Sequence, residues 1–144
     1  MTFNRANPWQ SYRQVVTQTA SPGQLVLMLY DGALRFLGQA LVGFTKDDPL
    51  EFNLTINENV QRAQAILQEL NRTLNMEEGG QFSATLRLLY DYLDRRLQES
   101  NVHKTEEGIH EVLRRVTILR DAWAEMLAKS AGAPAPSSVE NAVA

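Results

Sequence analysis

The chain has 144 residues, 44% of them hydrophobic, with 14 lysines and arginines against 17 aspartates and glutamates. One hydrophobic core is enough for this length, and a net charge of −3 supplies no positive field for nucleic acid or an anionic membrane. The absence of cysteine excludes disulfides, thiolate catalysis and cysteine-based zinc sites. These values describe one soluble domain that binds no nucleic acid.

Neither a targeting signal nor a membrane segment is predicted. Residues 1–10 contain Arg5 but no apolar h-region, so a secretory signal is not expected. The longest purely apolar run, Leu25–Tyr30, has six residues, against the roughly 20 that span a bilayer. We therefore expect a protein that stays in the cytoplasm without membrane insertion.

Apolar residues recur with helical periodicity in four segments, and no segment alternates as a strand would, so the sequence predicts an all-α protein. In the first segment Ser21 can cap a helix that begins at Pro22, where the missing N–H of proline costs nothing. Gln24, three residues after Ser21, completes a capping box. This helix should run to about Phe44.

Asp48 and Pro49 repeat this start for a second helix, whose apolar residues continue at three- and four-residue spacing to Leu74. The glycines at 79–80 then predict a break in the chain. A third helix should follow, and its core face is made of Phe82, Leu86, Leu89, Leu93 and Leu97. Residues 101–104 should form the next turn.

Thr105 should cap the fourth helix, with Glu106 and Glu107 at its positive end. The core face of this helix is made of Ile109, Val112, Val116, Leu119, Trp123 and Met126. Because short connections between long helices make neighbours antiparallel, the predicted architecture is an up-down four-helix bundle over residues 21–130.

Both ends of the chain differ from this bundle. Residues 1–20 are mostly polar, but Trp9, Tyr12 and Val15 can form a short amphipathic turn that docks when a groove is available. Residues 131–144 are rich in alanine, proline and serine and have too few large apolar side chains to order themselves. We expect this tail to be disordered.

Three of the four helices present apolar arcs much wider than a bundle requires. A bundle position needs an arc of about 100°, whereas the first, third and fourth helices cover about 180–200° and the second about 120°. The excess predicts apolar grooves at the surface that bind a partner, although splayed helices or a homodimer can cover the same arcs. The predicted binding residues widen these arcs or lie at their edges: Leu27, Tyr30, Leu34, Leu88, Tyr90, Tyr92, Ile118 and Ala122.

The sequence predicts neither a catalytic site nor a metal site. Glu107 and His110 form one Glu-x-x-His, but a di-iron bundle needs two such motifs and two more glutamates facing inward. The catalytic-serine, phosphate-loop and dinucleotide motifs are all missing. We therefore expect a non-enzymatic protein without cofactors, and a di-iron enzyme is only a distant alternative.

Four blocks follow one another at a specific spacing: TASPGQLVLMLYDGA at 19–33, Asn-Glu with RAQAILQEL within 57–70, Gly-Gly to Arg-Arg-Leu within 79–97, and LRDAW at 119–123. Over about residues 12–127 the chain resembles the FliS family of flagellin-export chaperones. The resemblance implies an antiparallel four-helix bundle in the bacterial cytoplasm. Such a chaperone binds the C-terminal segment of flagellin, prevents its premature polymerisation and aids its delivery to the flagellar type III export apparatus.

The resemblance also gives the N-terminal segment a role. It implies that the residues around Trp9, Tyr12 and Val15 can occupy the client groove when that groove is empty, and that Tyr12 docks on the export gate protein FlhA. The alternative that the residues alone leave open is a helical scaffold whose apolar stripes serve homo-oligomerisation.

Overall fold

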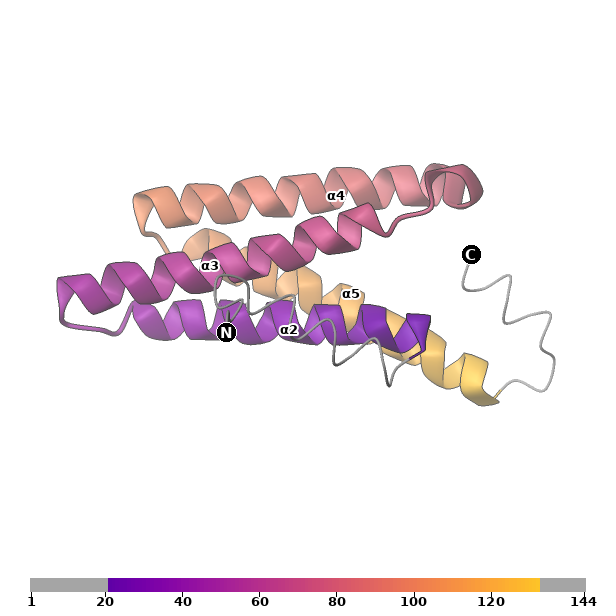
Figure 1. The fold of residues 1–144 in the computed structure, drawn as a ribbon, viewed down its shortest axis with the longest axis horizontal. Helices are drawn as coiled ribbons and strands as arrows, with labels where there is room; N and C mark the ends of the chain where they lie inside the picture. Colours follow the sequence, from indigo (N-terminus) through magenta and orange to yellow (C-terminus); the bar gives the residue numbers. More distant parts are fainter. Residues whose placement is uncertain (1–20, 133–144) are drawn as a thin grey trace, which may run out of the picture.

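The structure, a computed structural model, describes residues 21–132. These residues form four helices and no strand: α2 (Pro22–Gly43), α3 (Pro49–Arg72), α4 (Met76–His103) and α5 (Glu107–Gly132) (Figure 1). The predicted all-α fold is confirmed. The N-terminal docking residues Trp9, Tyr12 and Val15, and the tail from residue 133, lie outside the described residues.

The two helix starts read from the sequence are confirmed by their caps. The Ser21 hydroxyl accepts a hydrogen bond from the backbone N–H of Gln24 at 3.2 Å. The Asp48 carboxylate accepts one from the N–H of Glu51 at 3.0 Å. Each cap satisfies a backbone donor that the helix itself leaves unpaired, a contribution of about 1 kcal/mol.

The predicted break at the two glycines is a kink inside α4. Gly80 has φ 53° and ψ −127°, a conformation that a residue with a Cβ rarely adopts. One helical turn precedes the kink and begins at Met76, and the Asn75 side chain caps it by accepting from the N–H of Glu78 at 3.0 Å. The third helix therefore begins earlier than the sequence predicts.

The connection between α4 and α5 is also displaced from its predicted place. Residues 101–103 belong to α4, and Lys104, with φ 52°, ends that helix in the left-handed conformation. The carbonyl of Glu106 accepts from the N–H of His110 at 3.0 Å, so Glu106 occupies the cap position predicted for Thr105. At its far end α5 continues to Gly132, two residues beyond the predicted bundle boundary.

The four helices pack in a ring as an up-down bundle. α2 contacts α3 and α5, and α4 contacts the same two neighbours, so α2 and α4 are diagonal partners. Connections 44–48 and 104–106 lie at one end of the bundle, at the left of Figure 1, and connection 73–75 lies at the other. We call the end with two connections the hairpin end.

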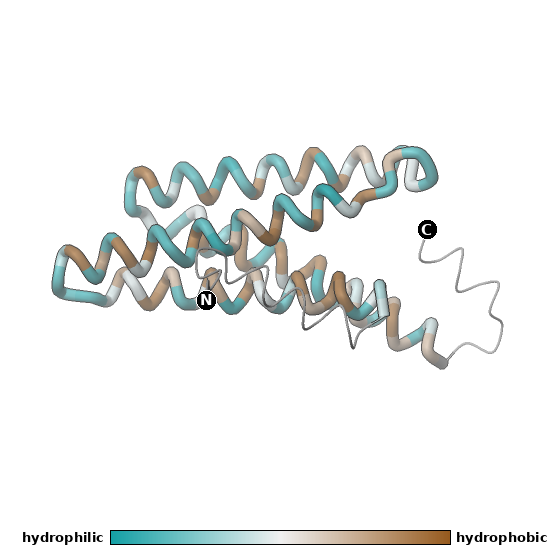
Figure 2. Tube along the Cα trace, viewed as in Figure 1, coloured by the Kyte–Doolittle hydropathy of each residue, from teal (hydrophilic) through white to brown (hydrophobic). Residues whose placement is uncertain are grey.

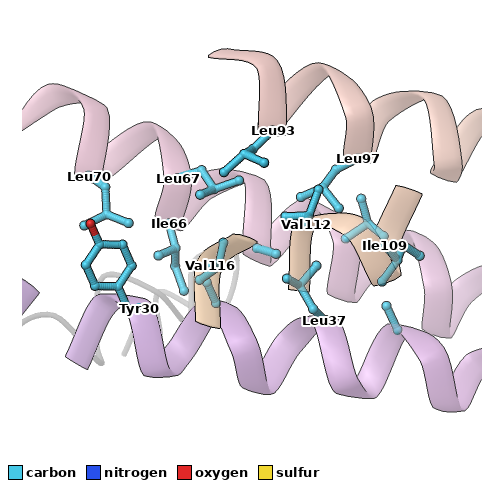
Figure 3. Close-up of a cluster of buried hydrophobic side chains, with 14 of the residues drawn as sticks. Tyr30, Leu37, Ile66, Leu67, Leu70, Leu93, Leu97, Ile109, Val112 and Val116 are labelled. Carbon is cyan, nitrogen blue, oxygen red and sulfur yellow. The ribbon is translucent and has the colours of Figure 1, made fainter. Parts of the chain in front are cut away.

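The core lies between all four helices. Figure 3 shows leucines of α3 and α4 pointing inward toward the valines of α5 and Leu37 of α2. Its largest fully buried side chains include Leu37, Ile56, Ile66, Leu67, Leu70, Leu93, Leu97, Ile109, Val112 and Val116. The core faces predicted for the third and fourth helices are confirmed at five positions in this set: Leu93, Leu97, Ile109, Val112 and Val116.

By length and composition α2 is the one helix among residues 21–132 that is apolar enough to cross a membrane. The same property belongs to a core helix of a soluble bundle. Ala33, Leu37 and Ala40 of α2 are completely buried against the other helices.

Candidate binding surface

α4 and α5 are joined by hydrogen bonds near the hairpin end. The Glu111 carboxylate of α5 accepts from the Tyr92 hydroxyl at 2.7 Å and from Nε of Arg96 at 2.8 Å, both on α4. Arg115, one turn along α5, donates to the same carboxylate at 3.0 Å, and its guanidinium carbon lies 5.9 Å from the Tyr92 ring centre. We call these four residues the Glu111 cluster.

The hydrogen bonds of the Glu111 cluster change the acid–base properties of two of its members. The bond from Tyr92, followed by those from the arginines, lowers the pKa of Glu111 from 4.5 to about 2. The same bond raises the pKa of Tyr92, because the neighbouring carboxylate disfavours a phenolate. At neutral pH the cluster therefore consists of a carboxylate, a neutral phenol and two guanidinium groups.

At the other end of the bundle α5 is attached to α2. Arg120 donates to Asp31 at 2.8 Å. The indole Nε1 of Trp123 donates to the carbonyl of Gly23 at 2.8 Å. α5 also packs more extensively on α2 than on α4. These contacts draw the C-terminal half of α5 toward α2.

The middle of α4, residues 87–94, is attached to α3 instead. Arg87 donates from Nε to the side-chain oxygen of Asn71 at 3.1 Å. Asn71 donates to Asp91 at 2.9 Å, and Gln64 donates to Asp94 at 2.9 Å. As a result α4 and α5, which lie side by side near the hairpin end, separate toward the opposite end of the bundle (Figure 1).

This separation leaves apolar side chains uncovered on both helices. In the register set by the bonds from Tyr92 and Arg96 to Glu111, Leu88 lies opposite residues 115–119 of α5. Leu88 is 72% exposed and Ile118 is 68% exposed. Ala122, one turn after Ile118, is exposed as well.

Phe82 also belongs to this surface, and the sequence did not predict it there. It begins the predicted core face of the third helix, yet it is 69% exposed. Toward this end of the bundle α5 is bound to α2 through Arg120 and Trp123, which leaves Phe82 uncovered within residues 21–132. We call Phe82, Leu88, Ile118 and Ala122 the α4–α5 face.

The remaining predicted binding residues are distributed elsewhere. Tyr92 is partly buried at the edge of the α4–α5 face, with its hydroxyl bound to Glu111. Leu27 and Leu34 are partly buried one turn to either side of Asp31 on α2, so they lie beside the α2–α5 contact. Whether they bind a partner remains a prediction.

Tyr30 and Tyr90, predicted as surface anchors, are buried, and the structure corrects their placement. Each is 3% exposed, and their hydroxyl oxygens lie 2.6 Å apart. Burial raises the pKa of both tyrosines. The pair joins the diagonal helices α2 and α4, so both hydroxyls have a partner inside the core and neither belongs to the exposed surface.

We expect Tyr90→Phe to lower the free energy of unfolding by about 1–2 kcal/mol, because it leaves the Tyr30 hydroxyl buried without its partner. The double variant Tyr30→Phe/Tyr90→Phe should be more stable than the sum of the single variants predicts. Urea unfolding followed by circular dichroism measures all three. Additive losses would show that the two hydroxyls are not coupled.

The histidines show no arrangement suited to a metal. Within residues 21–132, acidic and histidine side chains do not gather in groups of three or more that could hold a metal ion. His110 is exposed, and its Nε2 lies 3.7 Å from a carboxylate oxygen of Glu106. This surface pair involves a different glutamate from the Glu-x-x-His that the sequence suggested.

The comparison with known proteins agrees with this architecture. Residues 5–130 match the family described as "Flagellar protein FliS". The chain belongs to the FliS family. Among relatives named flagellar secretion chaperone FliS, the Bacillus subtilis protein is 41% identical over 84% of this chain and 86% of its own length. The Campylobacter jejuni protein is 34% identical over 82% of this chain and 89% of its own length. The Salmonella typhimurium protein is 31% identical over 84% of this chain and 90% of its own length.

The predicted family is thereby confirmed, and so is its coarse function. FliS is a family of flagellar secretion chaperones, so this FliS member is a flagellar export chaperone. An export chaperone works by binding its client, which requires an exposed surface that a client can cover. The α4–α5 face is the candidate for that surface.

Proposed function

We propose that this protein binds the C-terminal segment of flagellin on the α4–α5 face, prevents its polymerisation in the cytoplasm and aids its delivery to the export apparatus. The observation that carries the proposal is the exposure of Leu88 and Ile118 at one level of two separated helices, with Phe82 beside them. Large apolar side chains exposed on two neighbouring helices indicate a binding site. Beyond α4 and α5, Leu27 and Leu34 extend the proposed site.

The energetics require an extended contact. A client that folds on the chaperone loses about 2–5 kcal/mol or more in becoming ordered. Burial of about 1,000 Å² of apolar surface contributes roughly 25 kcal/mol before that cost and the cost of association are subtracted. An amphipathic helix of the client, with apolar residues at three- and four-residue spacing, would cover the exposed side chains of the α4–α5 face.

The N-terminal segment belongs to the proposal as well. Trp9, Tyr12 and Val15 would occupy this surface when no client is bound, and Tyr12 would contribute to docking on FlhA. A competing segment lowers the apparent affinity for the client by the fraction of molecules in which the surface is free. No catalytic step is required for this cycle of capture and release.

The test is a charge placed on the α4–α5 face. Leu88→Asp and Ile118→Asp should each weaken binding of a flagellin C-terminal peptide at least tenfold, about 1.4 kcal/mol, because an aspartate would be buried against the client. Isothermal titration calorimetry measures the affinity. Both side chains are more than two-thirds exposed, so the helicity seen by circular dichroism should not change.

Val102→Asp is the matched control. Val102 lies on α4 like Leu88 and is 65% exposed, but it is at the hairpin end, so this variant should bind the peptide with unchanged affinity. Unchanged affinity in both Leu88→Asp and Ile118→Asp would remove this face from the site. Native mass spectrometry tests the rival scaffold: a monomer that forms a 1:1 complex supports the chaperone, and a tight dimer indifferent to peptide supports self-association.

A further inference from the structure

A second group of exposed apolar side chains lies at the hairpin end. Leu50 and Leu54, one turn apart on α3, are 65% and 47% exposed, and Val102 in the last turn of α4 is 65% exposed. Figure 2 shows hydrophobic segments of α3 and α4 at this end, next to hydrophilic ones. We call these three residues the hairpin-end patch. It is at the opposite end of the bundle from the α4–α5 face.

The start of α3 extends past the end of α4, which explains why Leu50 and Leu54 are exposed. Asn101 of α4 donates to the side-chain oxygen of Asn57 on α3 at 2.8 Å, which sets the register between the two helices. Leu54 and Leu50 continue the face of Asn57 by one and two turns toward the start of α3. Because α4 ends at His103, it does not reach them.

The end of α4 is held in place. The Lys104 ammonium donates to the carbonyl and to the side-chain oxygen of Asn101, both at 2.7 Å. The left-handed backbone of Lys104 and the bond from the N–H of Thr105 to the carbonyl of Ser100, at 3.0 Å, end the helix there. The patch is therefore preformed, and a partner can bind it without a change in the fold.

The chain segments at the hairpin end are rich in acidic residues. Residues 46–58 and 102–107 contain six carboxylates, Asp47, Asp48, Glu51, Glu58, Glu106 and Glu107, against Lys46 and Lys104. The rest of the chain contains nearly equal numbers of both signs, 12 of the 14 basic residues and 11 of the 17 acidic residues. The hairpin end thus carries more negative charge than the net −3 of the whole protein.

We propose that the hairpin-end patch docks a basic amphipathic helix of a partner protein other than flagellin. Aliphatic side chains of that helix would cover Leu50, Leu54 and Val102. Its lysines or arginines would pair with the carboxylates of residues 46–58 and 102–107, which we call the acidic rim. A second copy of this chain fits poorly, because a symmetric contact would bring two acidic rims together. A patch of three side chains suits a transient contact, and its position lets the partner bind while flagellin occupies the α4–α5 face.

A synthetic probe tests this proposal. The probe is an 18-residue helical peptide with leucines at three- and four-residue spacing and lysines elsewhere, and its matched control carries glutamates in place of the lysines. We expect the lysine peptide to bind at least tenfold more tightly than the glutamate peptide in fluorescence anisotropy. Leu50→Ser/Leu54→Ser should weaken lysine-peptide binding at least tenfold, and Leu88→Ser/Ile118→Ser should not weaken it.

Three results would overturn the proposal. An equal loss in Leu88→Ser/Ile118→Ser would place the peptide on the α4–α5 face, and equal binding of the two peptides would remove the role of the acidic rim. A dimer in native mass spectrometry that Leu50→Ser/Leu54→Ser dissociates would identify the occupant as a second copy. Flagellin-peptide affinity, measured on the same variants, is expected to stay unchanged in Leu50→Ser/Leu54→Ser, so failure here leaves the proposed chaperone site standing.

Discussion

Replacement of Gly108 by alanine should lower the free energy of unfolding by about 2–3 kcal/mol. Gly108, in the first turn of α5, is buried against α4. A Cβ at this position would collide with the Ser100 hydroxyl and would lie 3.0 Å from the carbonyl oxygen of Arg96. Because the second contact is with backbone, α4 and α5 would have to move apart at this close contact.

Ser100→Ala provides the partner for a double-mutant cycle. The Ser100 hydroxyl is buried and has no hydrogen-bond partner within the described part of the chain, so its removal should leave stability equal or higher. In that background Gly108→Ala should cost less, since the closest contact is gone. Thermal and urea unfolding measure the cycle.

Gly38→Ala is the matched control for the glycine substitution. Gly38 lies inside α2, and a Cβ there meets no atom within 4 Å. Alanine at that position should raise the free energy of unfolding by up to about 1 kcal/mol through its higher helix propensity. If Gly108→Ala were as stable as Gly38→Ala, the close approach of α4 and α5 would not be a constraint on the fold.

The fold was predictable because its signals are local. Ser21 and Asp48 lie next to the prolines that start their helices, and the spacing of Ile109, Val112 and Val116 identifies a core face without reference to any other helix. The boundaries were less predictable. Gly80 kinks α4 where a pair of glycines suggested an end, because the preceding turn has its own cap.

The exposed surface was only partly predictable, since it depends on contacts between distant residues. An apolar arc shows how wide a stripe is but not which edge faces solvent. Arg120 and Asp31 are 89 residues apart in the sequence, and Trp123 and Gly23 are 100 apart. These two contacts draw α5 toward α2 and thereby uncover Phe82.

The burial of Tyr30 and Tyr90 was unpredictable for the same reason. Tyr30 and Tyr90 look amphipathic on separate helices, and a polar group at the edge of an apolar arc is usually placed in water. They are 60 residues apart, and only the packing of α2 and α4 brings their hydroxyls together. A buried pair that satisfies itself carries no local signal in either helix.

Loss of the Glu111 carboxylate should be the second large effect on stability. Glu111→Gln is expected to lower the free energy of unfolding by about 2 kcal/mol at pH 7, because hydrogen bonds to charged groups contribute more than neutral ones. The carboxylate accepts from Tyr92, Arg96 and Arg115 and is only 16% exposed. An amide has one acceptor oxygen and would turn an N–H group toward a guanidinium.

The pH dependence of this loss follows from the pKa of Glu111. Since folding lowers that pKa from 4.5 to about 2, the carboxylate stabilises the fold fully above pH 4.5, and this contribution is lost as the pH falls toward 2. The difference between wild type and Glu111→Gln should therefore be constant from pH 7 to about 5 and shrink below it. Urea unfolding at pH 7, 5, 4, 3 and 2 measures this difference directly.

Glu125→Gln is the control for the loss of a carboxylate from α5. Glu125 pairs with Lys129 at 3.1 Å, but both side chains are more than two-thirds exposed, so the change should cost less than about 0.5 kcal/mol. If the cost of Glu111→Gln were the same at pH 2 as at pH 7, it would come from altered packing. A cost that disappears at low pH identifies the charged Glu111 cluster as the contact that holds α4 on α5 before the two helices separate.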